Sequence, residues 1–271
     1  MTARRRGRGA TGLLELGGLL SDRDQRILRD TARHRFLTTR QIEQLFFFDH
    51  ASALSGARAC RRVLRRLEAT GLLATLPRRI GGLQAGSASS IWTLAPAGAR
   101  MLSYLGGDGI TARLREPSSR FVEHALAIAE VHVALRQAER AGRFAVERLQ
   151  VEQEGWRSYL GPSGVTEWLK PDLAVVTATP EFEDHWFIEA DLGTEHLPTV
   201  IRKCRQYESY RRTGVEQADG NVFPVVVWAA TTPLRAEKLR RAIRAQRTLD
   251  QALFRVCLLS GVADALAEAG S

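Results

Sequence analysis

The chain has 271 residues, of which 44% are hydrophobic and 25% are charged. These proportions are those of a folded globular protein and exclude a chain that is mainly disordered. The net charge of +9 is unevenly spread. Residues 1–120 carry 21 Arg, no Lys and nine acidic residues, whereas the remaining residues carry 18 basic and 21 acidic ones. The first half is therefore the one expected to meet a polyanion such as DNA. A solvated basic surface without a partner is the alternative.

The three cysteines, Cys60, Cys204 and Cys257, lie far apart and show no CxxC spacing. This pattern argues against a zinc site or a disulfide framework and favours a reducing compartment. The apolar stretch near the start of the chain is short and contains Glu15, so we do not expect a signal peptide. Because no apolar run approaches the length of a transmembrane helix, we expect a cytoplasmic protein without a membrane partner.

Shifts in composition divide the chain into four predicted segments. Residues 1–18 are expected to form a flexible basic tail, which either contacts DNA phosphates or is simply a disordered end. Residues 19–105 predict a first domain, and the Gly- and Ser-containing stretch 106–119 predicts a linker. Residues 120–271 predict a second domain.

Three helices are expected at the start of the first domain. Ser21 or Asp22 can cap the first helix, and Thr38 or Thr39 can cap the second. After a polar loop, the stretch ARACRRVLRRLEATG predicts a third helix that ends at Gly71. The stretches LLATLPRRI and IWTLAPAGARML then predict two strands around a Gly- and Ser-rich tip. This order is typical of a winged helix-turn-helix domain.

Arginines supply the predicted DNA contacts of this first domain. In the winged helix geometry the third helix enters the major groove of double-stranded DNA, while the wing and the loops contact the backbone. A solvated basic helix face is the alternative for any one of these residues. The predicted DNA-binding residues are Arg40, Arg58, Arg61, Arg62, Arg65, Arg66, Arg78 and Arg79.

The second domain alternates between helical and strand patterns. The expected elements are, in chain order, a helix at 120–142, strands at 144–151, 168–178 and 185–193, a helix from about 194 to 212, a strand at 223–230, a helix at 233–246 and a strand at 253–260. This order predicts a mixed sheet with helices packed on it. Together with the first domain it places the chain in the α+β class.

Three acidic residues stand at the ends of the predicted strands. Asp172 follows Pro171 at the start of one strand, and Glu189 and Asp191 lie two apart near the end of the next, so that their side chains share a face. If the two strands are antiparallel, the three carboxyl groups meet at one edge. Carboxylates in such a cluster are ligands for Mg²⁺, with Asp172 and Glu189 as the proposed metal ligands. A metal held there can assist hydrolysis of a phosphodiester.

The following helix carries Lys203, Tyr207 and Tyr210 at spacings that place them on one face. We expect Lys203 to join Asp172, Glu189 and Asp191 as a catalytic residue, and the two tyrosines to be auxiliary. A purely structural role is the alternative. Asp172 would then be a turn residue, Glu189 and Asp191 would mark an exposed strand end, and the helix face with Lys203 would serve packing.

The stretches KPDLAVV and FIEADLGT resemble the PD-(D/E)XK signature of the restriction-endonuclease-like fold. In that superfamily a lysine usually stands two positions after the second acid, where this chain has Asp191. Some members carry the lysine on the next helix, a place that Lys203 would fill. The resemblance implies a nuclease-like second domain.

The chain as a whole resembles the replication-relaxation family of plasmids and other mobile elements over about residues 21–212. The resemblance rests on HRFLTTRQIEQLFF, ARACRRVLRRLEATGLL and IWTLAPAGA in the first domain, and on EHALAIAEVHVAL, KPDLAVV, IEADLGTE and the helix with Lys203 and Tyr207 in the second. It implies a role in replication, transfer or maintenance of such an element.

Two main hypotheses follow. In the first, a DNA-binding protein carries a nuclease-like domain that cleaves DNA with Mg²⁺. In the second, a non-catalytic transcriptional regulator, or an accessory factor of replication or of the relaxosome, uses that domain for a protein partner or for a homodimer. A repressor that senses a small molecule is a third interpretation, which would need an apolar pocket.

Overall fold

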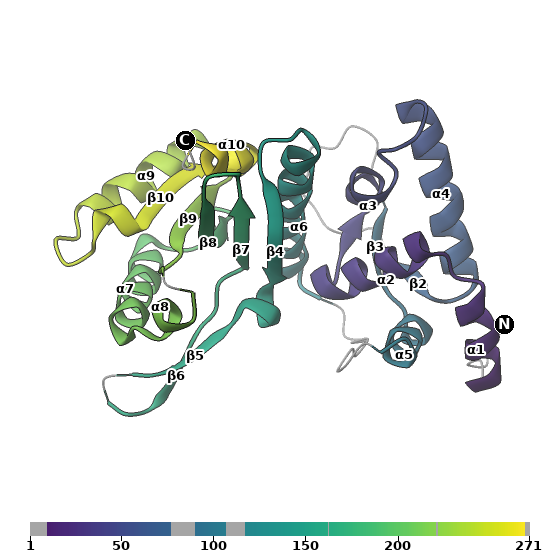
Figure 1. Ribbon diagram of the computed structural model, residues 1–271, viewed down its shortest axis with the longest axis horizontal. Helices are drawn as coiled ribbons and strands as arrows, with labels where there is room; N and C mark the ends of the chain where they lie inside the picture. The colour runs from purple at the N-terminus through teal and green to yellow at the C-terminus, as the bar shows by residue number, and fades with distance from the viewer. Residues whose placement is uncertain (1–9, 77–89, 107–116, 162, 221, 269–271) are drawn as a thin grey trace. The chain divides into compact units, whose positions relative to one another are not determined.

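The computed structural model describes residues 10–76, 90–106, 117–161, 163–220 and 222–268 (Figure 1). The chain divides into two compact units, Met1–Ala129 and Glu130–Ser271. The division falls inside helix α6 (Ser119–Arg140). The predicted linker at 106–119 lies mostly outside the described residues. Within those residues, no helix is long and apolar enough to cross a membrane.

The first unit combines helices with a small antiparallel sheet. Its elements are α1 (Ala10–Gly18), α2 (Asp22–His34), β1 (Leu37–Thr38), α3 (Thr39–Phe46), α4 (Ala53–Ala69), β2 (Leu73–Thr75), β3 (Ile91–Leu94), α5 (Pro96–Tyr104) and the first part of α6. The strands pair in the order β1-β3-β2. This arrangement is compatible with a winged helix-turn-helix, although the expected tip of the wing lies outside the described residues.

Side-chain caps start the three central helices. Ser21 accepts a hydrogen bond from the backbone N–H of Asp24, and Thr38 and Ser52 cap α3 and α4 in the same way. The cap at Ser52 explains why α4 begins four residues earlier than the predicted stretch. Gly56 in the first turn of α4 allows the helix to lie close to the end of α3, because a Cβ atom there would lie 2.7 Å from the carbonyl oxygen of Phe47.

One prediction for this unit is wrong. Residues 10–18, expected to be part of a flexible tail, form α1. Leu16 provides a reason, because its side chain is buried and a short helix gains stability mainly from packing an apolar face. Residues 1–9, which hold the cluster of arginines, lie outside the described residues.

The second unit is built on a five-stranded mixed sheet. After the second part of α6, its elements are β4 (Ala145–Val151), β5 (Arg157–Leu160), β6 (Thr166–Leu169), β7 (Leu173–Ala178), β8 (Glu183–Asp191), α7 (Leu197–Thr213), α8 (Val215–Gly220), β9 (Val225–Ala230), α9 (Pro233–Arg244), β10 (Phe254–Leu258) and α10 (Val262–Ala267). The sheet order is β10-β9-β8-β7-β4. Strands β4, β7 and β8 are antiparallel neighbours, whereas β8, β9 and β10 are parallel. The predicted mixed α+β class is thus confirmed.

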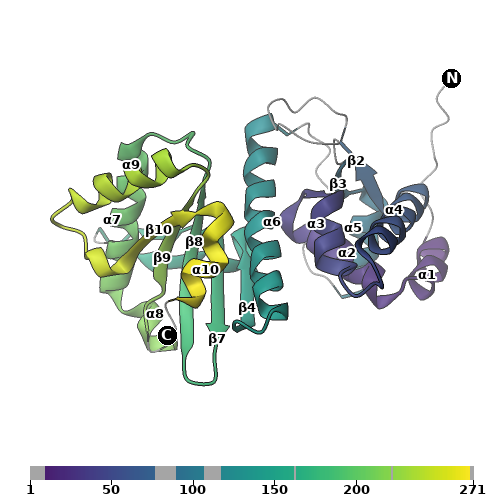
Figure 2. The ribbon, with the colours of Figure 1, turned by 90° about the horizontal axis from the view of Figure 1, so that it is seen from above.

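Helices α7 and α9 cover one face of this sheet (Figures 1 and 2). The core on that face contains Phe187 of β8, Trp228 of β9, Tyr207 of α7 and Leu239 of α9, all buried. Strands β5 and β6 form a separate hairpin that contacts α7. This hairpin was not predicted, because residues 168–178 were expected to form one strand. Pro171 interrupts that stretch, since proline lacks the N–H that a continuous ladder needs.

Candidate functional site

Helix α4 carries a row of arginines on its solvent side. Arg58, Arg61, Arg62 and Arg65 are exposed, and within the described residues none of them forms an ion pair. The opposite side of the helix is buried through residues such as Leu64. The guanidinium groups therefore face solvent from a helix that is fixed by its apolar side.

Of the other four predicted DNA-binding arginines, the structure describes two, and their surroundings differ from those of the row on α4. Arg66 forms an ion pair of 2.5 Å with Asp24, whose side chain is 1% exposed, so it anchors α4 to α2. Arg40 is exposed in the first turn of α3. Arg78 and Arg79 lie outside the described residues.

The predicted acidic site lies at one end of β7 and β8. The two strands are antiparallel, with Leu173 opposite Ile188, so the start of β7 meets the end of β8. Asp172, just before β7, accepts a hydrogen bond of 2.8 Å from the backbone N–H of Ala190 through its Oδ2 atom. The structure therefore brings Asp172 next to the strand that carries Glu189.

Glu189 is the centre of a buried hydrogen-bonded group. Its side chain is 3% exposed. Lys203 Nζ donates to Oε2 over 2.5 Å, and Tyr207 Oη donates to Oε1 over 2.5 Å. Both donors come from adjacent turns of α7, at the spacing of four residues that the sequence showed. Both carboxylate oxygens of Glu189 thus have a partner, one of them a cation.

Burial and neighbouring charges shift the proton affinities in this group. Burial raises the pKa of the Glu189 carboxyl to about 7, against the opposing effect of the Lys203 charge, and the charge of Asp172 raises it further. Burial lowers the pKa of Lys203, but the charges of Glu189 and Asp172 outweigh this effect and raise it. The pKa of the Tyr207 hydroxyl is raised by burial and by Glu189, so this group stays a hydrogen-bond donor.

Asp191 does not join the Glu189 group. Its carboxylate accepts hydrogen bonds from Nε and Nη2 of Arg235, at 2.9 and 2.8 Å, and from the backbone N–H of Gly193, at 2.6 Å. Arg235 also donates to the carbonyl oxygen of Glu195. Such a bidentate pair with a buried carboxylate fixes the segment between β8 and α7 to α9. The structure thus assigns Asp191 to an internal ion pair and not to the predicted catalytic group.

Tyr210 also lies apart from the Glu189 group. Its hydroxyl donates to Oε2 of Glu216 over 2.6 Å, and Arg157 of β5 forms an ion pair with the same carboxylate at 3.0 Å. The ring of Tyr210 packs against Tyr159, with centroids 5.1 Å apart. These contacts hold the β5–β6 hairpin against α7, so Tyr210 serves the framework of the unit.

Asp172 and Glu189 remain as candidate ligands for Mg²⁺. This ion takes oxygen ligands and often uses only one or two carboxylates together with water and a phosphate. Asp172 and Glu189 fit as such a pair, because carboxylate oxygens keep further lone pairs after one hydrogen bond each. Across the described ranges, however, no three His, Cys, Asp or Glu side chains gather closely enough to hold a metal ion.

A pocket of about 480 Å³ opens beside this group. It is lined by Glu167, Glu195, Thr199, Arg202, Lys203, Arg205 and Gln206. Lys203, whose side chain is 27% exposed, reaches both this pocket and the buried Glu189. Of the hydrogen-bonded side chains Glu189, Lys203 and Tyr207, Lys203 is therefore the one that a ligand from solvent can reach.

Three arginines near these groups were not predicted from the sequence: Arg202, Arg205 and Arg235. No spacing rule links Arg235 to Asp191, 44 residues earlier, so this pair could not be expected from the sequence. The arginines of α7 do show a helical spacing, which could have been noticed. Their positive charge is concealed in the sequence, because the second half of the chain as a whole has a net negative charge.

Comparison with known families gives one match. The family model described as replication-relaxation matches residues 28–226, which is almost three quarters of the chain and includes both α4 and the Glu189 group. Comparisons with curated proteins and with solved structures found no match. The chain belongs to the replication-relaxation family.

Proposed function

We propose that this protein binds double-stranded DNA through α4 and acts in the cytoplasm in the replication of a plasmid or another mobile element. The observation that carries the proposal is the exposed row of arginines on α4 that pair with no described acid. Membership of the replication-relaxation family supports the biological setting.

The surroundings of α4 support its role as the DNA-contacting helix. It follows α2 and α3 in an order compatible with the winged helix, where the third helix enters the major groove. Arg61, Arg62 and Arg65 lie within four residues, a little more than one turn. Arginine forms bidentate hydrogen bonds with phosphates and with the edge of guanine, so such a row suits both backbone contact and base recognition.

Replacing Arg61, Arg62 and Arg65 together by Gln tests this proposal. A matched control replaces Arg26, Arg29 and Arg100, which are also exposed in the first unit. We expect the α4 variant to bind duplex DNA about tenfold or more weakly than the control in a mobility-shift titration. Equal affinities of the two variants, with unchanged circular dichroism, would contradict the proposal.

A specific observation favours a second activity, metal-dependent cleavage of DNA by the second unit. Lys203 and Tyr207 converge on Glu189, and Asp172 lies close enough for its charge to raise the pKa of Glu189. Asp172 and Glu189 would hold Mg²⁺, which when bound supplies a Lewis acid for the phosphodiester. Asp191 has no part in this proposal, because Arg235 occupies it.

The residues of the chain would divide the remaining tasks. Lys203 keeps its positive charge beside the carboxylates and faces the pocket, where it can stabilise negative charge on a phosphate. Tyr207 orients the Glu189 carboxylate through its hydroxyl. Because the Glu189 carboxyl, with a pKa of about 7, must lose its proton to bind a metal ion, Mg²⁺ binding should strengthen as pH rises.

Incubation of supercoiled plasmid with Mg²⁺ or Mn²⁺ tests this second activity. Asp172→Asn and Glu189→Gln are compared with Asp184→Asn, which changes an acid of β8 far from its last residues. We expect nicking by the wild type and the Asp184 variant and none by the other two. Absence of metal-dependent nicking in the wild type would favour the non-catalytic accessory factor instead.

A further inference from the structure

The second unit has a strongly uneven distribution of charge. Residues 121–196 contain six basic and 14 acidic residues, whereas residues 197–258 contain 12 basic and five acidic ones. The latter segment begins with α7 and includes α9. The net negative charge of the second half of the sequence therefore conceals a basic region around these two helices.

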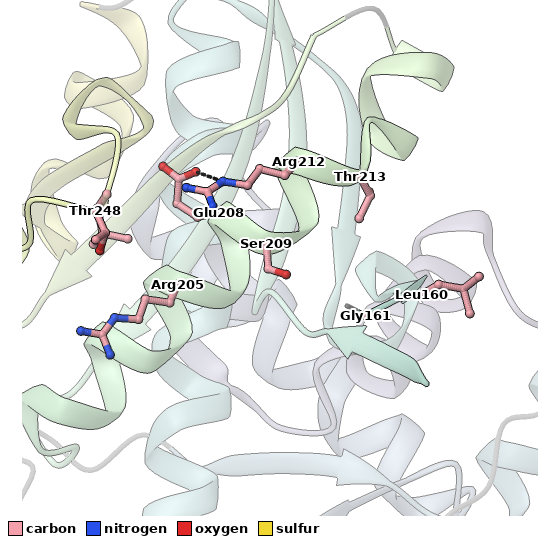
Figure 3. Close-up of a pocket in the computed structure, with 9 residues that line it drawn as sticks. Leu160, Gly161, Arg205, Glu208, Ser209, Arg212, Thr213 and Thr248 are labelled. Atoms are coloured by element: carbon pink, nitrogen blue, oxygen red, sulfur yellow. Dashed lines mark ion pairs between the residues drawn. The ribbon is translucent and has the colours of Figure 1, made fainter. Parts of the chain in front are cut away.

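Helix α7 presents part of this charge as a stripe. Arg202, Arg205 and Arg212 stand at helical spacings of three and seven residues, and the first and last of them lie about 15 Å apart along the axis. All three are exposed. Figure 3 shows Arg205, Ser209 and Arg212 following one another along the helix.

Two shallow pockets follow the stripe. Arg202 and Arg205 line the pocket that also contains Lys203. Arg205 and Arg212 line a second pocket of about 360 Å³, together with Ser209, Thr213 and Thr248 (Figure 3). Because Arg205 lines both, the two pockets adjoin along α7.

The segment after α9 extends the same surface. Arg205 Nη2 donates to the side-chain oxygen of Gln246 over 2.8 Å, and Thr248 lines the second pocket. Arg247 lies between Gln246 and Thr248 in the sequence and is exposed. We define the α7 arginine surface as Arg202, Arg205, Arg212 and Arg247.

The acids near this surface cancel only part of its charge. Glu208 is 5% exposed and pairs with Arg211 at 3.2 Å and with Arg212 of the surface at 3.8 Å. It also accepts the backbone N–H of Asp250 at 2.7 Å. Glu167 accepts a hydrogen bond from Tyr159, and Glu195 is exposed at the rim of the first pocket. Within the described residues, Arg202 and Arg247 form no ion pair.

The residues of the surface suit the phosphate backbone of duplex DNA. Single-stranded DNA binds where aromatic side chains stack on its bases. Of the described residues that line the two pockets none is aromatic. Arginine, Ser and Thr side chains are those that contact the phosphates of a duplex without reading its bases.

We propose that the α7 arginine surface is a second site for double-stranded DNA, which binds the phosphate backbone separately from α4. The proposal rests on the proposed function for its choice of partner, and the surface adjoins the pocket where Lys203 is proposed to meet a phosphate. A protein with two such sites can hold two segments of a duplex, or one segment at two places.

The test uses the full chain and four variants. Arg202, Arg205 and Arg247 are replaced together by Gln, and a matched control replaces Arg140, Arg148 and Arg255, which are exposed elsewhere in the second unit. Each triple is also combined with the Arg61, Arg62 and Arg65 substitutions. Arg212 is left unchanged because of its contact with the buried Glu208. Affinity for a short duplex, and for a single strand of the same length, is measured by fluorescence anisotropy over a range of salt concentrations. Thermal unfolding checks the fold.

We expect the α7 triple to make the plot of log affinity against log salt less steep by about 2 to 3, since each lost phosphate contact removes about 0.9. In the α4-substituted background, the α7 triple should remove the residual duplex binding that its control keeps. Equal slopes for the α7 triple and its control would overturn the proposal, as would a loss confined to single-stranded DNA. Loss with the α7 triple, but not with the variant that combines the α4 substitutions and the control triple, would uphold this site and contradict the proposed role of α4.

Discussion

Glu189 and Asp191 lie two residues apart on β8, yet each is neutralised by a cation from a different helix. Lys203 of α7 pairs with Glu189, and Arg235 of α9 pairs with Asp191. A buried carboxylate that loses its cation remains in a poorly solvated place, which is costly. The geometry therefore predicts that each pair behaves as an energetic unit.

Lys203→Met should lower the free energy of unfolding by about 3 kcal/mol at a pH well above 7, where Glu189 is ionised and loses its cation. Adding Glu189→Gln should recover part of this loss, since the amide needs no counter-charge. Urea denaturation of the wild type, both single variants and the double variant measures the coupling, expected at about 1 to 3 kcal/mol. Strictly additive losses would show that the pair does not act as a unit.

The raised pKa of Glu189 has a consequence for the dependence of stability on pH. The folded carboxyl binds its proton up to about pH 7, whereas its ordinary pKa is 4.5. Between these values the folded state holds more protons than the unfolded state, so this residue lowers stability as pH rises, by at most about 1.4 kcal/mol per pH unit. Denaturation across this window should show a decrease in the wild type that is smaller in Glu189→Gln. Identical pH profiles would contradict the burial of a titrating group here.

Much of this residue-level arrangement was visible in the sequence. The acids at the strand ends and the spacing of Lys203 and Tyr207 follow from the periods of strands and helices, and the structure places Asp172, Glu189, Lys203 and Tyr207 together. The contacts of Asp191 and Tyr210 were not predictable. Their partners, Arg235 and Glu216, come from other elements, and only tertiary packing sets those distances.

At the scale of elements, α5 is held unusually close to β2. A Cβ atom on Gly98 would lie 2.1 Å from the carbonyl oxygen of Leu72, an atom that also accepts the backbone N–H of Ala95. Because the obstacle is backbone, a side chain could enter only if the helix or the strand moved. Glycine at this position thus sets the distance between α5 and the small sheet.

Gly98→Ala should therefore destabilise the first unit by about 1 to 3 kcal/mol, the usual cost of forcing an extra methyl group into a packed site. Gly18→Ala is the matched control, because nothing lies within 4 Å of a Cβ there. We expect the control to have little effect or a small stabilising one. Thermal unfolding of the two variants measures the difference, and equal unfolding temperatures would be the opposing result.

The elements of the second unit show where prediction from sequence ends. Strand β9 was predicted from its continuous apolar run, and helix α9 was predicted from the helical spacing of its apolar residues. The β5–β6 hairpin was missed because its strands have four residues each and little apolar alternation. The GPSG stretch between them was the available signal, since Gly and Pro mark turns.

At the scale of the whole molecule, positive charge lies in both units and not only in the first. A count over the second half of the sequence averages a basic segment with an acidic one. Only the fold shows that the basic segment includes an exposed stripe of α7 beside two pockets. Both proposed DNA contacts depend on arginine and should weaken together as salt rises.

The dependence of duplex affinity on salt concentration tests the central claim, DNA binding through α4, most directly. The wild type and the variant with Arg61, Arg62 and Arg65 replaced by Gln are titrated with the same duplex at a series of salt concentrations. If these arginines contact phosphates, the slope of log affinity against log salt becomes less steep by about 2 to 3 in the variant. A variant with the slope and affinity of the wild type would contradict the claim and place the DNA contact elsewhere.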